Sequence, residues 1–160
     1  MIFSVRQAEP ADRDSCVAIL QQLPDYFTPN TYDELRRHFS APDAWVAVDP
    51  GENSVVGFVL VESRYFGTAE ITFAAVLREH HGFGIGTTLV EQAFAALAER
   101  RVVIVEVKTL DASVDYKPYG ATRRFWESRG FRQIDCIDPL PGWPPGNPAA
   151  IYAAALAATR

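Results

Sequence analysis

The stretch Val76-Leu-Arg-Glu-His-His-Gly-Phe-Gly-Ile-Gly-Thr-Thr-Leu-Val90 decides how this chain is organised. An apolar run over residues 71–77 leads into it. Gly82, Gly84 and Gly86 stand at alternate positions, and a helical pattern then begins without a break. A strand, a glycine loop and a helix present free backbone N–H groups to an anion at the helix N-terminus. The stretch therefore predicts a site for a phosphate-bearing ligand.

Composition limits the class of protein. With 160 residues, 48% of them hydrophobic, the chain is expected to form one domain over residues 1–160. A net charge of -5 argues against a nucleic-acid partner, which usually requires a basic stripe. The sequence start lacks a signal-peptide pattern, and the longest apolar tract, residues 149–158, is too short to cross a bilayer. We expect a cytoplasmic protein that neither enters a membrane nor, with only two cysteines, depends on disulfides.

Hydrophobic periodicity predicts the element order β-α-α-β-β-β-α-β-α-β-β. The first helix begins near residues 10–12, and Thr31 with Glu34 predicts a capping box at the start of the second. The alanines of the last segment would suit a helix as well as a strand. The expected strands are residues 2–7, 44–48, 55–62, 70–77, 102–107, 131–137 and 151–156, and the two later helices start near residues 85 and 121.

Alternate glycines alone are weak evidence, and a tight strand-to-helix turn would also explain them. A P-loop requires a lysine after its last glycine, but Gly86 is followed by threonines. A dinucleotide-binding loop would place its third glycine at Leu89. Glu106 stands about 20 residues further on, as a ribose-binding acid would, but it lies inside a predicted strand, and an antiparallel meander precedes the loop. The third interpretation is a loop for acetyl-CoA.

The chain resembles the GNAT superfamily of acetyl-CoA-dependent N-acetyltransferases over almost its whole length. Residues 76–89 are similar to the family pattern Val-x-Pro-Glu-Tyr-Arg/Gln-Gly-x-Gly-Ile-Gly, with Arg78, His80 and His81 as departures. Residues 122–131 are similar to the family's Ala-x-x-x-Tyr-x-x-x-Gly-Phe segment. The opening residues and the segment around residues 145–152 also look like the family's first and last strands.

The resemblance implies an α/β (α+β) fold with a mixed, splayed sheet of about seven strands and about four helices. It implies that acetyl-CoA lies where the strand ending at Val76 separates from the strand over residues 102–107, with its pyrophosphate on the glycine loop. Because the family often dimerises, a homodimer remains an open alternative. The implied cofactor-binding residues are Phe73, Ala74, Ala75, Val76, His81, Gly82, Phe83, Gly84, Ile85, Gly86, Thr87, Phe125 and Trp126.

Acetyl transfer to an amine requires a base, a stabilised oxyanion and a proton for the leaving thiolate. The segment Ala69-Glu70-Ile-Thr-Phe resembles the one that carries the catalytic glutamate in the histone-acetyltransferase branch, which makes Glu70 the candidate base. Strand alternation would place Glu70 on one face with Thr72, Ala74 and Val76. Desolvation among these small or apolar neighbours would raise its pKa. An ordinary solvated glutamate at a strand end is the alternative.

The family's usual acid is a tyrosine, but that position holds Trp126, whose indole N–H is no acid near neutral pH. Tyr116 or Tyr119 could protonate the thiolate instead, and solvent is a further alternative. Trp126 is then expected to serve packing, in the core or against the cofactor. His80 and His81 do not predict a metal site, because adjacent residues do not share a face and no third ligand stands at a suitable spacing.

The acceptor is expected to be a small-molecule or peptide amine. The predicted pocket walls are residues 23–32, Tyr65 with Phe66, residues 116–119, and Trp143. These aromatic residues would suit an apolar part of the acceptor, and the acidic balance would favour a cationic amine. A non-catalytic acyl-CoA-binding module or sensor is the main alternative function, and a nucleotide-binding enzyme is the third.

Overall fold

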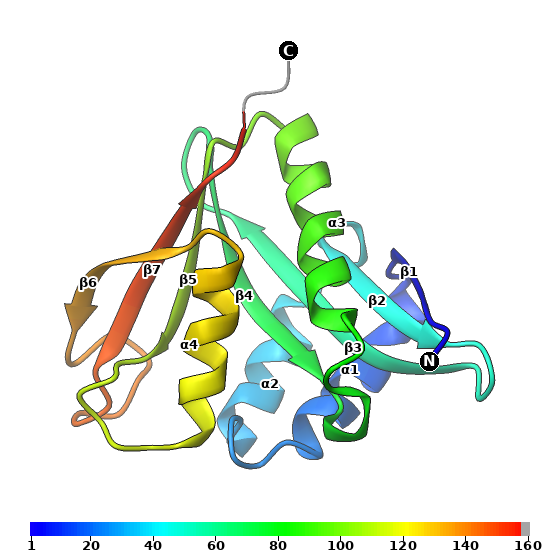
Figure 1. Cartoon of the computed structure of the whole chain (residues 1–160), viewed down its shortest axis with the longest axis horizontal. Helices are drawn as coiled ribbons and strands as arrows, with labels where there is room; N and C mark the ends of the chain where they lie inside the picture. Colours follow the sequence, from blue (N-terminus) through cyan, green and yellow to red (C-terminus); the bar gives the residue numbers. More distant parts are fainter. Residues whose placement is uncertain (158–160) are drawn as a thin grey trace.

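Seven strands form a single mixed sheet in the computed structural model, which describes residues 1–157 (Figure 1). The strand order is β1-β2-β3-β4-β5-β7-β6, with β4 and β5 parallel and every other neighbouring pair antiparallel. The sheet therefore confirms the predicted fold class. The strands are β1 (Ser4–Gln7), β2 (Ala44–Asp49), β3 (Ser54–Ser63), β4 (Thr68–Val76), β5 (Ile104–Leu110), β6 (Arg132–Ile137) and β7 (Ala149–Ala155).

Within the described residues, four α-helices cover the two faces of the sheet. Figure 1 shows α3 and α4 in front of it and α1 and α2 behind it. Helix α3 packs on β2, β3 and β4, α4 packs on β5, and α1 packs on β3 and β4. The helices are α1 (Arg13–Gln21), α2 (Pro29–His38), α3 (Ile85–Glu99) and α4 (Pro118–Ser128), and the short 3-10 turns are η1 (Pro10–Asp12), η2 (Ala41–Asp43) and η3 (Arg78–His80). No helix of the described residues is both long and apolar enough to cross a membrane.

The parallel pair β4–β5 opens along its length. Pairing runs from Thr68 opposite Ile104 to Ile71 opposite Val107 and then ends. Beyond this point the two strands diverge, as Figure 1 shows. We call the last paired residues, Ile71 and Val107, the junction, and the space between the diverging segments the gap. The splay is thus confirmed, and backbone groups of residues 72–76 are left without a strand partner on the side of β5.

A β-bulge in β4 overturns the predicted alternation. Leu60 pairs with Phe73 and Val61 pairs with Ile71, so Thr72 is the extra residue. Residues paired across antiparallel strands lie on the same face. Glu70 therefore shares a face with Phe73 rather than with Ala74 and Val76. The expectation was wrong because a bulge depends on the pairing partner, which a period-two pattern does not contain.

Other differences concern element ends. Helix α2 begins at Pro29 after the N-cap Thr28, so Thr31 is already inside the helix, and its hydroxyl donates to the Thr28 carbonyl at 2.5 Å. The predicted capping box is therefore absent. The final segment is a strand because β7 is paired on both sides, to β5 and to β6. This long-range pairing overrides the helical preference of its alanines.

Candidate active site

A cavity of about 490 Å³ fills the gap, with walls from β4, β5, α3, α4 and the segment after α1. Its volume is in the range of small-molecule sites. Among the predicted residues, Glu70, Phe83 and Tyr116 lie outside the lining. The predicted residues that line the cavity are Phe73, Ala74, Ala75, Val76, His81, Gly82, Gly84, Ile85, Gly86, Thr87, Tyr119, Phe125 and Trp126.

The glycine loop delivers the N-terminus of α3 to one end of this cavity. Gly82 and Gly84 adopt left-handed backbone conformations, with φ of 83° and 81°, which residues with a Cβ rarely adopt. The first intrahelical bond runs from the Thr88 N–H to the Gly84 carbonyl. The N–H groups of residues 85–87 therefore have no partner within the helix and face the cavity end with the positive pole of the helix dipole.

Gly86 permits close packing between α3 and α4. A Cβ at this position would lie 3.3 Å from the Phe125 ring, tighter than ordinary contact. Phe125 packs edge-on against Trp126, with ring centroids 4.9 Å apart, and Trp126 is 5% exposed. The ring pair forms the α4 wall of the cavity, which agrees with a packing function for Trp126.

His81 closes the loop end of β4. Its Nε2 lies 2.7 Å from the Val76 carbonyl oxygen. Because a carbonyl can only accept, Nε2 carries the proton and donates. The ring thus ties the glycine loop to the last residue of β4.

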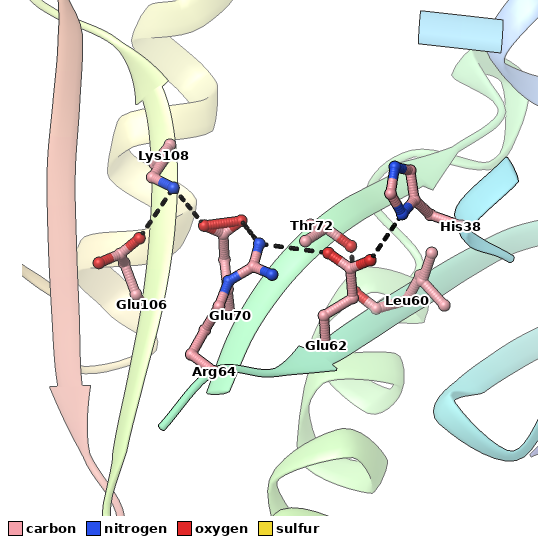
Figure 2. A network of polar contacts seen from close by, with 8 residues as sticks. All are labelled: His38, Leu60, Glu62, Arg64, Glu70, Thr72, Glu106 and Lys108. Atoms are coloured by element: carbon pink, nitrogen blue, oxygen red, sulfur yellow. Dashed lines mark hydrogen bonds and ion pairs between the residues drawn. The ribbon is translucent and has the colours of Figure 1, made fainter. Parts of the chain in front are cut away.

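Three glutamates lie side by side near the junction, one on each of three neighbouring strands. Glu70 pairs in register with Glu62 of β3 and with Glu106 of β5. Like charges directly opposite one another destabilise a sheet, but cations alternate with these carboxylates. Figure 2 shows the row Glu106, Lys108, Glu70, Arg64, Glu62 and His38.

Glu70 is 6% exposed. Its carboxylate accepts from Lys108 Nζ at 2.5 Å and from Arg64 Nη2 at 2.9 Å. Burial alone would raise the pKa of Glu70, but the hydrogen bond and charge of Lys108, together with the charge of Arg64, outweigh it and lower the pKa. The expected raised pKa was therefore wrong, because the neighbours of Glu70 are cations. Lys108 responds in the opposite direction: its carboxylate partners raise its pKa against the effect of burial.

Three tyrosines join the segment after α1 to the start of α4. The Tyr26 hydroxyl donates to the Pro118 carbonyl at 3.1 Å, the Tyr119 hydroxyl to the Tyr26 carbonyl at 3.0 Å, and the Tyr116 hydroxyl to the Asp25 carbonyl at 2.8 Å. We call this arrangement the tyrosine clasp. Burial raises the pKa of Tyr119 to about 12, so its hydroxyl keeps its proton at neutral pH.

Only some of the residues expected to form the acceptor pocket line the cavity. Leu23, Tyr26 and Phe27 line the cavity, whereas Tyr65 and Phe66 project into solvent. Trp143 does not line it either. Lys108 and Thr109 line the cavity and were missed, although Lys108 directly follows the apolar run 102–107. No group of three or more metal-ligating side chains gathers within residues 1–157.

Comparison with protein families identifies the class. A model described as the acetyltransferase (GNAT) family matches residues 13–131, which is more than half of the chain. The chain belongs to this family and is accordingly an acyltransferase. No curated protein matches it.

Solved structures show the same fold. An acetyltransferase of the GNAT family from Staphylococcus aureus is 14% identical with a TM-score of 0.78, and covers 98% of this chain and 100% of its own. The ribosomal-protein-S18-alanine N-acetyltransferase from Escherichia coli is 16% identical with a TM-score of 0.72, over 99% and 97% of the two chains. An aminoglycoside 6'-N-acetyltransferase solved with coenzyme A is 20% identical with a TM-score of 0.73, over 100% and 99%. At these identities the likeness concerns the fold.

Proposed function

We propose that this acetyltransferase transfers the acetyl group of acetyl-CoA directly to a primary amine. The observation that supports this most strongly is the gap between β4 and β5, which opens beside the free N–H groups at the start of α3. A thioester arm with amide groups needs unpaired backbone partners, and a pyrophosphate needs N–H donors at a helix N-terminus. Among the described residues that line the cavity there is no cysteine or serine, so neither of these two nucleophiles is at hand to form an acyl-enzyme.

The chain's own groups suggest how the cofactor is held. The unpaired backbone of residues 73–76 would bind the amide arm, and the N–H groups of residues 82–87 would bind the pyrophosphate. Phe83 contributes its backbone, because its side chain lies outside the lining. Phe125 and Trp126 would pack along the arm. The His81 ring braces the loop through Val76 rather than serving as the first pyrophosphate ligand.

Glu70 is the proposed proton acceptor, with Glu106 beside it as the more exposed carboxylate of the pair. Their shared contact is Lys108, whose Nζ lies 2.5 Å from Glu70 and 3.1 Å from Glu106. Because Glu70 is charged and does not line the cavity, it would take the amine's proton through a water molecule or through Glu106. Supporting this role is its place in β4, next to the junction where the gap begins.

Tyr119 is the proposed hydrogen-bond donor to the leaving thiolate. It lines the cavity, while Tyr116 does not. A phenol whose pKa is about 12 gives up its proton reluctantly. Its hydroxyl would turn from the Tyr26 carbonyl and donate a hydrogen bond to the thiolate, while solvent supplies the proton. Tyr119→Phe should therefore lower kcat and leave acetyl-CoA binding unchanged, whereas Tyr116→Phe should leave both unchanged. Equal effects of the two substitutions on kcat would contradict this assignment.

The acceptor is a small-molecule or peptide amine in this proposal. Cavity walls from Tyr26, Phe27 and Tyr119 favour an acceptor with an apolar or aromatic part. The similar structures include an aminoglycoside acetyltransferase and one acting on the alanine of a ribosomal protein. A useful acceptor panel is therefore tyramine, spermidine, kanamycin and a peptide with an N-terminal alanine.

The test is thiol release from acetyl-CoA with each amine of the panel, for the wild type and for Glu70→Gln. Removal of a general base typically lowers kcat/KM by about 10²-fold or more. Glu106→Gln distinguishes the two carboxylates, and Glu91→Gln, at an exposed position of α3, is the control. Loss with Glu106→Gln but not with Glu70→Gln would move the base to Glu106.

Thermal melting identifies the ligand class. Acetyl-CoA should raise the melting temperature, and ATP or NAD should not, because only a ligand that binds the folded state stabilises it. If acetyl-CoA raises the melting temperature but no amine of the panel causes thiol release, that result would favour an acyl-CoA-binding module over an enzyme. Stabilisation by ATP or NAD alone would overturn the proposal.

A further inference from the structure

The row of charges near the junction contains one bridge between β4 and β5, the two strands that border the gap. Lys108 is the first residue of β5 beyond the last pair, Ile71 opposite Val107. Its ammonium reaches back to Glu70 on β4 while it also contacts Glu106 on its own strand (Figure 2). Within residues 1–157, the only other cation that contacts Glu70 is Arg64. It lies in the turn after β3 and contacts Glu62 as well as Glu70.

Lys108 also differs from Arg64 in its surroundings. Lys108 lines the cavity and Arg64 does not. Its side chain is 29% exposed, compared with 40% for Arg64. A partly buried charge is screened less by solvent than an exposed one. Lys108 should therefore control Glu70 more strongly than Arg64 does.

We propose that Lys108 is a positioning residue for acetyl transfer, which holds the Glu70 carboxylate charged and fixed at the junction, where the gap opens. This inference rests on the proposed function of Glu70. Without Lys108, Glu70 and Glu106 would face each other on adjacent strands with no cation between them. Repulsion and burial would then favour the protonated form of one of them, and a protonated carboxyl cannot accept the amine's proton.

The groups that face Glu70 come from two strands and from the turn that follows one of them. Lys108 and Glu106 lie on β5, Glu62 lies on β3, and Arg64 follows β3. His38 of α2 is one step further away, 3.2 Å from Glu62. Removing Lys108 leaves two carboxylates and one cation in direct reach of Glu70, so the pKa of Glu70 must rise.

The first measurement does not depend on activity. A carbon-13 NMR titration of the glutamate carboxyl groups gives the pKa of Glu70, which is assigned by the signal that Glu70→Gln removes. Lys108→Met should raise this pKa by about one to three pH units, the usual effect of an adjacent opposite charge. Lys108→Arg should keep it low, because a guanidinium can also bridge the two carboxylates.

Arg64→Met is the matched control, because it removes the other cation and leaves the cavity lining intact. It should raise the pKa of Glu70 less than Lys108→Met does. An equal or larger shift from Arg64→Met would overturn the assignment to Lys108. Heat-induced unfolding of each variant at pH 7, in the presence of coenzyme A, checks that the fold and the cofactor site persist.

The second measurement is the pH profile of kcat/KM with the panel amine that releases thiol fastest. Because the base must be deprotonated, the acid limb should move to higher pH in Lys108→Met by the shift that the titration gives, and return in Lys108→Arg. A uniform loss at every pH would show that Lys108 only supports the structure. If the wild type transfers no acetyl group to any amine, the proposed function is wrong. If the pKa of Glu70 is unchanged in Lys108→Met, only the proposed role of Lys108 is wrong.

Discussion

Single residues decide the geometry of the proposed cofactor site. Gly82 and Gly84 supply backbone conformations that other residues resist, and Gly86 supplies space for the Phe125 ring. The first two requirements concern the chain's own torsion angles, and the third concerns a contact between two helices. The loop therefore depends on its glycines for two different physical reasons.

Gly86→Val is expected to weaken coenzyme A binding and to destabilise the fold. A Cβ would already approach Phe125 to 3.3 Å, and overpacking of this kind costs about 1–3 kcal/mol. Calorimetric titration with coenzyme A and urea unfolding measure the two effects. Unchanged affinity would show that the position of the Phe125 ring does not matter for the cofactor.

Gly120→Ala provides the contrasting substitution on α4. A Cβ there would lie 3.5 Å from Arg124 Nη1, an ordinary contact. Because glycine in a helix costs about 0.5–1 kcal/mol relative to alanine, the variant should be more stable by about this amount. The same urea titration measures it, and a loss of stability would contradict the expectation.

At the scale of elements, the sheet was easier to predict than its register. The glycine loop, its flanking strand and α3 follow from local sequence. The bulge at Thr72 does not, because it is defined by the partner strand. The charge row is equally non-local, since it unites residues from β3, β4, β5 and α2. Lys108 was missed for this reason: one lysine after an apolar run does not reveal which carboxylates it will meet.

At the same scale, the tyrosine clasp links the segment after α1 to the start of α4. The double variant Tyr26→Phe with Tyr116→Phe removes two of its hydrogen bonds, each contributing about 0.5–1.5 kcal/mol. Amide hydrogen exchange of residues 25–28 should become faster, while exchange in the glycine loop stays unchanged. Tyr65→Phe is the control, because Tyr65 is 86% exposed, and faster exchange in this control would contradict a specific effect of the clasp.

At the scale of the whole molecule, acid should lower the free energy of unfolding, because two buried carboxylates become protonated. Asp12 accepts from Arg6 at 2.7 Å and from the Glu9 N–H at 2.7 Å, and the hydrogen bond from Arg6 lowers its pKa against the effect of burial. Glu70 also has a lowered pKa. Each group therefore contributes stability that is fully present above the unfolded pKa of about 4 and is lost as the pH falls through the lower folded value.

Urea unfolding between pH 7 and pH 3 measures this loss. The free energy of unfolding should change little down to about pH 5 and then fall. In Asp12→Asn the free energy of unfolding should decrease less steeply below about pH 4, because one of the groups that take up protons on unfolding is gone. A slope identical to that of the wild type would assign acid sensitivity to other carboxylates.

The unpaired edge of β4 has a consequence for how this protein can change over time. A wall that binds through main-chain amides is present whatever side chains the strand carries, provided that the bulge and the splay persist. If residues 73–76 hold the acyl donor as proposed, substitutions along them can alter the shape offered to an acceptor while the donor site keeps its hydrogen-bonding groups. Such a division would let acceptor preference drift without loss of the proposed acyl donor. The fold itself is the same in compared structures that are only 14% to 20% identical to this chain.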